Sequence, residues 1–454
     1  MKEKIFHRMP CLSESAEITA AEIEKRLFDK NCGRQGPERA IQKFIHLNKK
    51  MLSFLGVSLE TSGSGKSFSI KFESSGFVGA IPIRMPYDGL AHKDFQVFPK
   101  FRKSEKSFPD LTRLLSKLDY SISPEYKDSE KLTQPYLLRP PMYYEAAKYI
   151  DEYARASKTK WVKFEVAKGV HNFPKASTNW NKYAQTCSDP RKALEFPSSD
   201  NLLTINHKEM RELKYVFEIA KTTILQPSVP GSLRYRYLGK IDLLQRALLP
   251  VSPRPTSHVV IHASDPTFIK KAKEQANVLL QNSSTFCVSA WRIDMSQLFE
   301  RYVQHVVTTA AKEKHALVKA NEKIHGQGKI PQWGLKYLEP DIIIKLNDNI
   351  FVADAKYKAH NYAFFKNSDT LKSTHRADLH QILAYCSFSP QQNKTGILFY
   401  PSDSWHSHKI QYTEKMSRTC NTVILCGIPF GADQLDDAVK SVKELLSSEE
   451  FSES

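Results

Sequence analysis

Two acidic residues and a lysine stand on neighbouring predicted strands and could together bind a divalent metal ion. Asp341 opens one apolar run, and Asp354 and Lys356 close the next one. The turn-rich segment 347–349 between the runs predicts a hairpin that brings Asp341 opposite residues 354–356. Alternate side chains of a strand share a face, so Asp354 and Lys356 lie together. The spacing therefore predicts that two carboxylates and an ammonium group converge at the end of an apolar hairpin.

This cluster has an ordinary interpretation and a chemical one. On a half-exposed strand, Asp and Lys are commonly solvent-facing partners. Both strands here are strongly apolar, as buried central strands are, and buried charges are costly unless they are paired or bind a metal ion. A divalent cation would relieve the repulsion between two close acids, and hard carboxylate oxygens suit Mg²⁺. We therefore favour a magnesium site at Asp341 and Asp354, with solvent-facing pairing as the alternative.

Two predicted helices flank the hairpin and could add polar groups to it. Glu300 lies inside the apolar helical run 298–303, where it is either a ligand of the metal or its surroundings, or an exposed helical glutamate. Gln381 and Tyr385 are four residues apart on a predicted helix and share a face. The ordinary alternative for this pair is a tyrosine in the core and a glutamine at the surface. A predicted strand at 396–400 follows this helix.

The chain carries an excess of positive charge that would attract a polyanion. Its 454 residues contain 66 Lys and Arg against 49 Asp and Glu, a net charge of +17. Such an excess raises encounter rates with nucleic acid, although a basic protein without that partner has the same composition. Four basic residues near the hairpin are candidates for phosphate contacts, namely Lys358, Lys366, Lys372 and Arg376.

Composition and patterning also exclude some classes of protein. No apolar run approaches the length of a membrane span, and the first ten residues are too polar for a signal-peptide core. The seven cysteines are scattered without a CxxC pair, which argues against structural zinc and fits a reducing compartment. We expect a cytoplasmic protein without membrane contact.

The predicted elements indicate an α/β protein in three parts. Residues 1–120 read as an α+β domain and a candidate for partner docking. Residues 121–285 form a mixed region of helices and strands, including a predicted strand at 258–263. Residues 286–454 alternate strands and helices around the acidic hairpin, after a long helix that is predicted to begin near Ile293.

One glycine-rich segment resembles the end of a phosphate-binding loop. Residues 63–67 read Gly-Ser-Gly-Lys-Ser, but the full pattern needs a glycine at position 60, where this chain has Glu60. The flanks alternate as strand, turn and strand rather than leading into a helix. We therefore predict a hairpin turn and expect that this chain itself binds no nucleotide.

The hairpin resembles the motif of the PD-(D/E)xK nuclease superfamily. Pro340-Asp341 is followed after 12 residues by Asp354-Ala355-Lys356. The resemblance implies a restriction-endonuclease-like mixed sheet flanked by helices and metal-dependent hydrolysis of a phosphodiester. It implies that Asp341, Asp354 and the backbone carbonyl of Ala355 bind Mg²⁺. Lys356 would position or activate the attacking water and stabilise charge on the phosphate.

The two flanking helices fit the same resemblance. The superfamily often supplies a further acid from an upstream helix, and Glu300 occupies that place as a metal ligand or a neighbour of one. Gln381 and Tyr385 resemble the Q-x-x-x-Y element of several branches of the superfamily. That element lies near the DNA backbone and the active site, so the resemblance adds both residues to the catalytic set.

A wider set of segments is similar to the McrC nuclease subunit of McrBC- and LlaJI-type restriction systems. The similarity covers about residues 230–430 and rests on four segments, 294–300, 339–341, 354–358 and 378–385. It implies an AAA+ GTPase partner of the McrB type, which binds GTP, recognises double-stranded DNA and translocates. The N-terminal region would dock on that motor and stimulate its GTP hydrolysis, in defence against phage or other foreign DNA.

Two other functions remain open at this point. One is a stand-alone repair or recombination nuclease on the same fold. The other is a non-catalytic adaptor that activates an AAA+ GTPase ring. The intact set of Asp341, Asp354 and Lys356 argues against the adaptor, since a dead nuclease would be expected to lose one of them.

Overall fold

The chain folds into two units, each with its own core. The structure, a computed structural model, describes residues 7–28, 36–100, 111, 113–115, 117, 118, 122, 124–133, 142–159, 161–227, 229, 231–283, 289–326, 328, 329, 331, 332, 334–347, 349–358, 369–388, 393–413 and 420–447. The first unit combines Met1–Pro140 with Ser289–Ser454, and the second is Pro141–Val288. The predicted α/β fold class is confirmed by the helices of both units and by the mixed sheets of the first unit.

The N-terminal part of the first unit holds two sheets. The five-stranded sheet has the order β1-β7-β6-β11-β8 and consists of β1 (Arg8–Pro10), β6 (Phe77–Arg84), β7 (Ala91–Phe98), β8 (Glu125–Lys131) and β11 (Ser289–Asp294). The second sheet is formed around β5 (Ser69–Ser74) by β2 (Ser13–Glu14), β3 (Ile18–Thr19) and β4 (Val57–Ser62). The helical segments are α1 (Ala20–Ile23), the π-helix η1 (Glu24–Phe28), α2 (Gly36–Phe54) and the 3-10 helix η3 (Gly65–Ser67).

β11 explains why the predicted first and third parts belong to one unit. It pairs antiparallel with both β6 and β8, although it lies more than a hundred residues after them in the chain. The predicted long helix, α10 (Met295–Lys312), therefore begins two residues later than expected. Asp294 ends the strand and caps the helix, because its Oδ1 accepts hydrogen bonds from the backbone N–H groups of Ser296 and Gln297.

The predicted hairpin turn at residues 63–67 is confirmed. β4 and β5 pair antiparallel on either side of it. Gly63 has a φ of +72°, and a Cβ at this position would lie 2.3 Å from the carbonyl oxygen of Ser67. Only glycine fits such a turn without strain. The segment is a tight β-connection and does not begin a helix that could bind phosphate.

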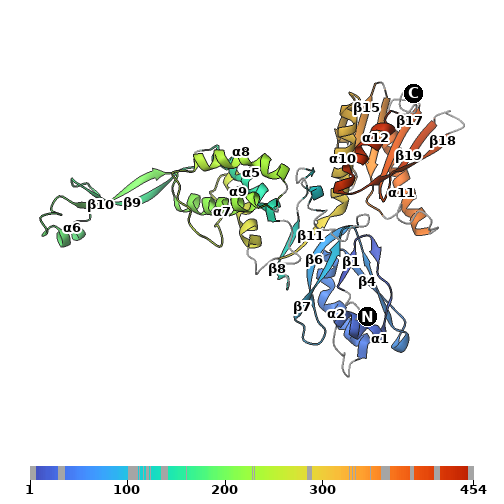
Figure 1. The fold of residues 1–454 in the computed structure, drawn as a ribbon, viewed down its shortest axis with the longest axis horizontal. Coiled ribbons are helices and arrows are strands. Elements are labelled where there is room, and N and C mark those ends of the chain that lie inside the picture. Colours follow the sequence, from blue (N-terminus) through green and yellow to red (C-terminus); the bar gives the residue numbers. More distant parts are fainter. Residues whose placement is uncertain are drawn as a thin grey trace. The chain divides into compact units, whose positions relative to one another are not determined.

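The C-terminal part of the first unit is built on a six-stranded mixed sheet (Figure 1). Its order is β12-β15-β16-β17-β19-β18, from β12 (Leu317–Ala320), β15 (Ile342–Leu346), β16 (Asn349–Ala355), β17 (Asn393–Ser402), β18 (His406–Thr413) and β19 (Cys420–Pro429). β16, β17 and β19 run parallel, whereas β12 and β15 at one edge and β18 at the other are antiparallel to their neighbours. The remaining elements are β13 (Ile324–His325), β14 (Tyr337–Leu338), α11 (Asp369–Cys386), the 3-10 helix η5 (Ala432–Gln434) and α12 (Leu435–Leu445).

Helices cover both faces of this sheet. On one face, α11 packs through Ile382, Tyr385 and Cys386 on Val352 and Leu398. The approach is close, because a Cβ at Gly396 would lie 2.7 Å from Ile382 Cγ1. The strand residues whose side chains point to the opposite face are also buried. The helices α10 and α12 cover that face, and they contact the strands and each other. The central strands are thus apolar on both faces.

The second unit combines four helices with a two-stranded ribbon. The helices are α5 (Met142–Ser157), α7 (Lys208–Leu225), α8 (Gly231–Ala247) and α9 (Thr267–Ser283). The ribbon pairs β9 (Lys163–His171) antiparallel with β10 (Phe196–Thr204) and carries the short helix α6 (Trp180–Thr186) between its strands (Figure 1). The predicted strand at 258–263 is wrong. Asn277 of α9 occupies the place of a partner strand, because its side chain accepts from Val259 N and donates to Val259 O.

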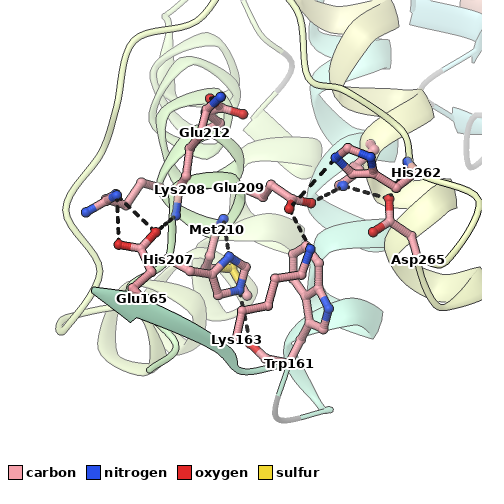
Figure 2. Close-up of polar contacts among 12 residues, drawn as sticks. Trp161, Lys163, Glu165, His207, Lys208, Glu209, Met210, Glu212, His262 and Asp265 are labelled. Carbon is pink, nitrogen blue, oxygen red and sulfur yellow. Dashed lines mark hydrogen bonds and ion pairs between the residues drawn. The ribbon is translucent and has the colours of Figure 1, made fainter. Parts of the chain in front are cut away.

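A buried charged network ties the base of the ribbon to the helices (Figure 2). Lys273 is fully buried and pairs with Glu209 and, over 2.7 Å, with Asp265. Glu209 also accepts from Lys163 at the start of β9 over 2.5 Å. The ammonium groups of both lysines lie over the ring of Trp161. Residues from β9, α7 and α9 thus share their charges within one cluster.

None of the described helices is both long and apolar enough to cross a membrane.

Candidate active site

The predicted acidic hairpin forms as β15 and β16. Ile342 pairs with Ala353 in the antiparallel register, which places Asp341 opposite Asp354. The turn includes Asn347, whose φ of +53° asparagine tolerates better than most residues. The centre predicted for the hairpin, Asp348, lies outside the described residues. The hairpin prediction is confirmed, and it brings the two carboxylates to the same end of the sheet.

A backbone hydrogen bond orients the first carboxylate. The N–H of Ala355 donates to Asp341 Oδ2 over 2.7 Å. The bond turns the carboxylate toward the end of β16. Ala355 thus contributes its N–H to Asp341, while its carbonyl is the group that the motif assigns to the metal.

Lys356 reaches both the second carboxylate and α11. Its ammonium group forms an ion pair with Asp354 and donates to Gln381 Oε1 over 3.0 Å. Gln381 Nε2 in turn donates to the hydroxyl of Tyr385 over 2.8 Å. The tyrosine hydroxyl lies 3.4 Å from the carbonyl oxygen of Glu339, to which it can donate. The Q-x-x-x-Y pair therefore lies beside the lysine rather than apart from it.

Glu300 stands on α10 behind Asp341 and is held by two amides. Its Oε1 accepts from Gln304 Nε2 over 3.1 Å and from Asn321 Nδ2 over 2.9 Å. The same Gln304 amide donates to the carbonyl oxygen of Asp341 over 3.1 Å, as does the backbone N–H of Asn321. Glu300 is thus linked to Asp341 through its neighbours.

Sequence reasoning did not find Gln304 and Asn321. The spacing of Gln304, four residues after Glu300 on an apolar helix, could have indicated that the two side chains meet. In the structure Gln304 is only 6% exposed. Asn321 has a φ of +52° in the connection that follows β12, and its sequence neighbourhood does not indicate that role. Both residues hold the backbone at the start of β15.

The electrostatics of the two acids favour a bound cation. Burial, followed by the charge of Asp354, raises the pKa of Asp341. Burial also raises the pKa of Asp354, against the opposing effect of Lys356. Burial disfavours the charge on Lys356, but Asp354 and Asp341 outweigh it and raise the pKa of the ammonium group. The lysine therefore stays charged, and a bound cation would offset the burial and repulsion that disfavour the charged forms of the two acids.

The donor atoms present fit a hard divalent cation. Asp354 is 1% exposed, and although its Oδ2 is ion-paired with Lys356, it accepts no well-aligned hydrogen bond from the described residues. Among these residues, no three His, Cys, Asp or Glu side chains are grouped closely enough to bind one ion. Two carboxylates and the Ala355 carbonyl suit Mg²⁺, which usually keeps several water ligands and needs few protein groups.

The basic residues near the hairpin differ in their surroundings. Lys358 is paired with Asp378 over 2.5 Å, and Tyr400 donates to the same buried carboxylate over 3.1 Å. Lys358 therefore anchors the end of β16 to α11, a role that the sequence did not indicate. Lys372 and Arg376 are exposed on α11, and Lys366 lies outside the described residues.

Comparisons with known proteins identify one family. Residues 93–401 match the family model of the McrBC 5-methylcytosine restriction system component. Comparison with curated proteins gave no significant match. Among solved structures, the chain is similar to one from a refined half-complex of the tetradecameric assembly of Thermococcus gammatolerans McrB AAA+ hexamers with bound McrC. The two chains are 14% identical with a TM-score of 0.45, over 97% of this chain and 98% of that one.

A second solved structure is more distant. It comes from the cryo-EM structure of the Thermococcus gammatolerans McrBC complex, with 14% identity and a TM-score of 0.28. The alignment covers 83% of this chain and 99% of that one. The matched family model spans both the hairpin with Asp341 and Asp354 and the Gln381–Tyr385 pair.

Proposed function

Because this chain belongs to the McrBC 5-methylcytosine restriction system component family, we propose that it is the DNA-cleaving subunit of such a system. The reaction is the hydrolysis of a phosphodiester in double-stranded DNA. The observation that supports it is the buried pair Asp341 and Asp354 at the end of one hairpin, with Lys356 beside them and one carboxylate oxygen short of hydrogen bonds.

Each residue of the site has a role in this reaction. Asp341, Asp354 and the Ala355 carbonyl would hold Mg²⁺, which when bound supplies Lewis-acid stabilisation of charge on the phosphate. Lys356 keeps its proton, because the neighbouring acids raise its pKa. It therefore acts as a hydrogen-bond donor and a positive charge that orients the water and the phosphate, and is a poor general base.

The supporting residues fix the direction of these groups. Gln381 holds the Lys356 ammonium from α11, and Tyr385 holds the Gln381 amide. Glu300 with its two amide partners holds the backbone of Asp341 from the other side. Such fixed orientation is what catalysis by positioning requires.

The proposed subunit works with a GTP-hydrolysing AAA+ partner, in the cytoplasm. The family is one of restriction system components, and the P-loop-like segment of this chain is a hairpin turn. GTP would therefore bind to the partner, and residues 1–120 are the candidate for docking on it. The net charge of +17 favours association with DNA.

Plasmid cleavage with Mg²⁺ tests this proposal. The wild-type chain and Asp354→Ala are each incubated with supercoiled plasmid, with and without GTP and the AAA+ GTPase encoded beside it. We expect cutting only by wild type and only with GTP and the partner present. Efficient cutting by wild type alone would favour a stand-alone nuclease. Stimulation of GTP hydrolysis without any cutting would favour the adaptor.

A further inference from the structure

A cavity of about 370 Å³ opens on the C-terminal sheet next to the candidate active site. Its floor includes Ile343 of β15 with Ile350 and Val352 of β16. Two aromatic residues, Tyr385 and Phe388, line it from the end of α11. The cavity is thus mainly apolar, with aromatic rings on one side.

The floor lies on the same face of the sheet as the two acids. Val352 stands two residues before Asp354, and Ile343 stands two residues after Asp341. Side chains two residues apart on a strand share a face and are about 7 Å apart. Tyr385 lines the cavity and also contacts Gln381, the partner of Lys356. The cavity therefore begins within about one nucleotide of the position of the reacting phosphate.

The cavity exists because α11 covers only part of this face. The helix ends at Cys386 and packs on β16, β17 and β19. Farther along the same face, β15 and β12 extend past it, and Leu317 of β12 is 57% exposed. Phe388 is 56% exposed just beyond the helix. An apolar surface with an exposed ring is thus left beside the acids.

Two lysines stand at the rim of the cavity. Lys319 and Lys345 line it from β12 and β15 and are both exposed. Lys319 is paired with Glu322 over 2.6 Å. Glu322 also lines the cavity and offsets the charge of Lys319, so Lys345 supplies the positive charge at the rim that suits a phosphate, while the floor and the aromatic wall suit the flat face of a base.

We propose that this cavity receives one nucleobase of the cleaved strand, turned out of the base stack next to the scissile phosphate. The proposal rests on the proposed nuclease function. The base packs between the apolar floor and Phe388, and Lys345 contacts the neighbouring phosphate. Turning out a base is least costly when the base is mismatched. The subunit therefore acts preferentially beside unpaired or mismatched positions.

Photocrosslinking of a labelled duplex tests the position of the base. The full-length chain is bound, with Ca²⁺ in place of Mg²⁺, to a short duplex with one 5-iododeoxyuridine opposite guanine. Long-wavelength irradiation then joins the base to a nearby aromatic ring, and the joined peptide is identified by mass spectrometry. We expect the crosslink at Phe388 or Tyr385. Crosslinks that map only to other parts of the chain would overturn the proposal.

Three variants sharpen the test. Phe388→Ala removes the wall, and Leu317→Trp fills the cavity from an exposed position, so each should lower the crosslink yield several-fold. Tyr412→Ala removes a half-exposed ring from β18, at the opposite edge of the same sheet, and should leave the yield unchanged. Equal yields in all three variants would overturn the proposal.

Cleavage by the same proteins separates this proposal from the proposed function. With Mg²⁺, GTP and the partner, wild type should cut beside the mismatch several-fold faster than in a matched duplex, and Phe388→Ala should lose that preference. Cutting without any preference or crosslink contradicts the base cavity and retains the nuclease. A crosslink without cutting contradicts the nuclease and retains the cavity.

If Phe388→Ala weakens only binding of the partner protein, the cavity is a protein-docking site and the proposal is wrong.

Discussion

Lys356 Nζ donates a hydrogen bond to Gln381 Oε1 over 3.0 Å, which fixes the end of β16 to α11 beside the two acids. The contact gives the Q-x-x-x-Y element a physical role, because the glutamine directs the ammonium group of the lysine.

Gln381→Leu should lower the rate of DNA cleavage about tenfold without unfolding the chain. The change removes one hydrogen bond to a charged group, worth about 1.5–3 kcal/mol, and leaves Lys356 less well directed. Single-turnover cleavage with saturating DNA measures the effect. Gln381→Glu retains an acceptor for the lysine and should recover part of the rate. Equal cleavage rates for Gln381→Leu and wild type would show that Lys356 needs no support from α11.

Asp354→Asn should stabilise the metal-free chain against heat and abolish its response to Mg²⁺. Burial and mutual repulsion make two negative charges at Asp341 and Asp354 costly, so the removal of one charge relieves them. Wild type should melt at a higher temperature with Mg²⁺ than without it. Asp242→Asn, in an exposed ion pair with Arg246, is the control and should change little. A Mg²⁺ response retained by Asp354→Asn would contradict the metal site.

Lys273→Met should destabilise the second unit far more than Lys163→Met. Both lysines pair with Glu209, but Lys273 is fully buried and Lys163 is 35% exposed. Loss of Lys273 leaves the buried Asp265 without its ion-pair partner and Glu209 with Lys163 alone, and should cost about 3–5 kcal/mol. Loss of the exposed partner should cost about 0.5–1 kcal/mol. Hydrogen exchange of the α7 and α9 amides compares the two, and equal effects would refute the assigned burial.

The second unit should lose stability as the pH falls below about 6.5. His207 caps α7, since its Nδ1 accepts from Met210 N while Nε2 faces the carbonyl oxygen of Trp161. Burial lowers the pKa of His207, while Glu209 and Glu165 oppose that effect and Lys163 adds to it. A lowered pKa means that the unfolded chain binds the proton more readily. The contribution of His207 is therefore fully present above about pH 6.5, the pKa in the unfolded chain, and is lost progressively as the pH falls from there through the lower pKa of the folded chain.

His207→Asn provides the matched comparison for this pH effect. Asparagine is also a good helix cap but does not titrate. Exchange of the α7 amides at about pH 7.5 and about pH 5.5 should show a fall in protection for wild type and a smaller fall for the variant. An identical fall in both proteins would assign the effect to another group.

The sequence predicted the acidic hairpin well because its determinants are local. Two apolar runs and a turn define β15 and β16, and their register places Asp341 opposite Asp354. The side-chain period of two then brings Lys356 to Asp354. The spacing of Gln381 and Tyr385 likewise predicted a shared helix face, and the two side chains do contact each other.

Features that depend on distant partners were not predictable in this way. β11 is a strand only because β6 and β8, far earlier in the chain, pair with it. Asn321 supports Asp341 and Glu300 through contacts that link separate elements. The apolar segment at 258–263 has the alternation of a strand, but the Asn277 side chain satisfies the backbone of Val259 instead. Local periodicity carries no information about such contacts.

The most direct test of the central claim compares nicking of supercoiled plasmid by wild type, Lys356→Ala and Lys358→Ala, with Mg²⁺, GTP and the AAA+ partner. The two lysines are two residues apart, but only Lys356 pairs with Asp354, whereas Lys358 pairs with Asp378. With equal binding of the partner by all three proteins, Lys356→Ala should abolish nicking and Lys358→Ala should retain most of it. Undiminished nicking by Lys356→Ala would show that the hairpin of Asp341 and Asp354 is not the nuclease centre.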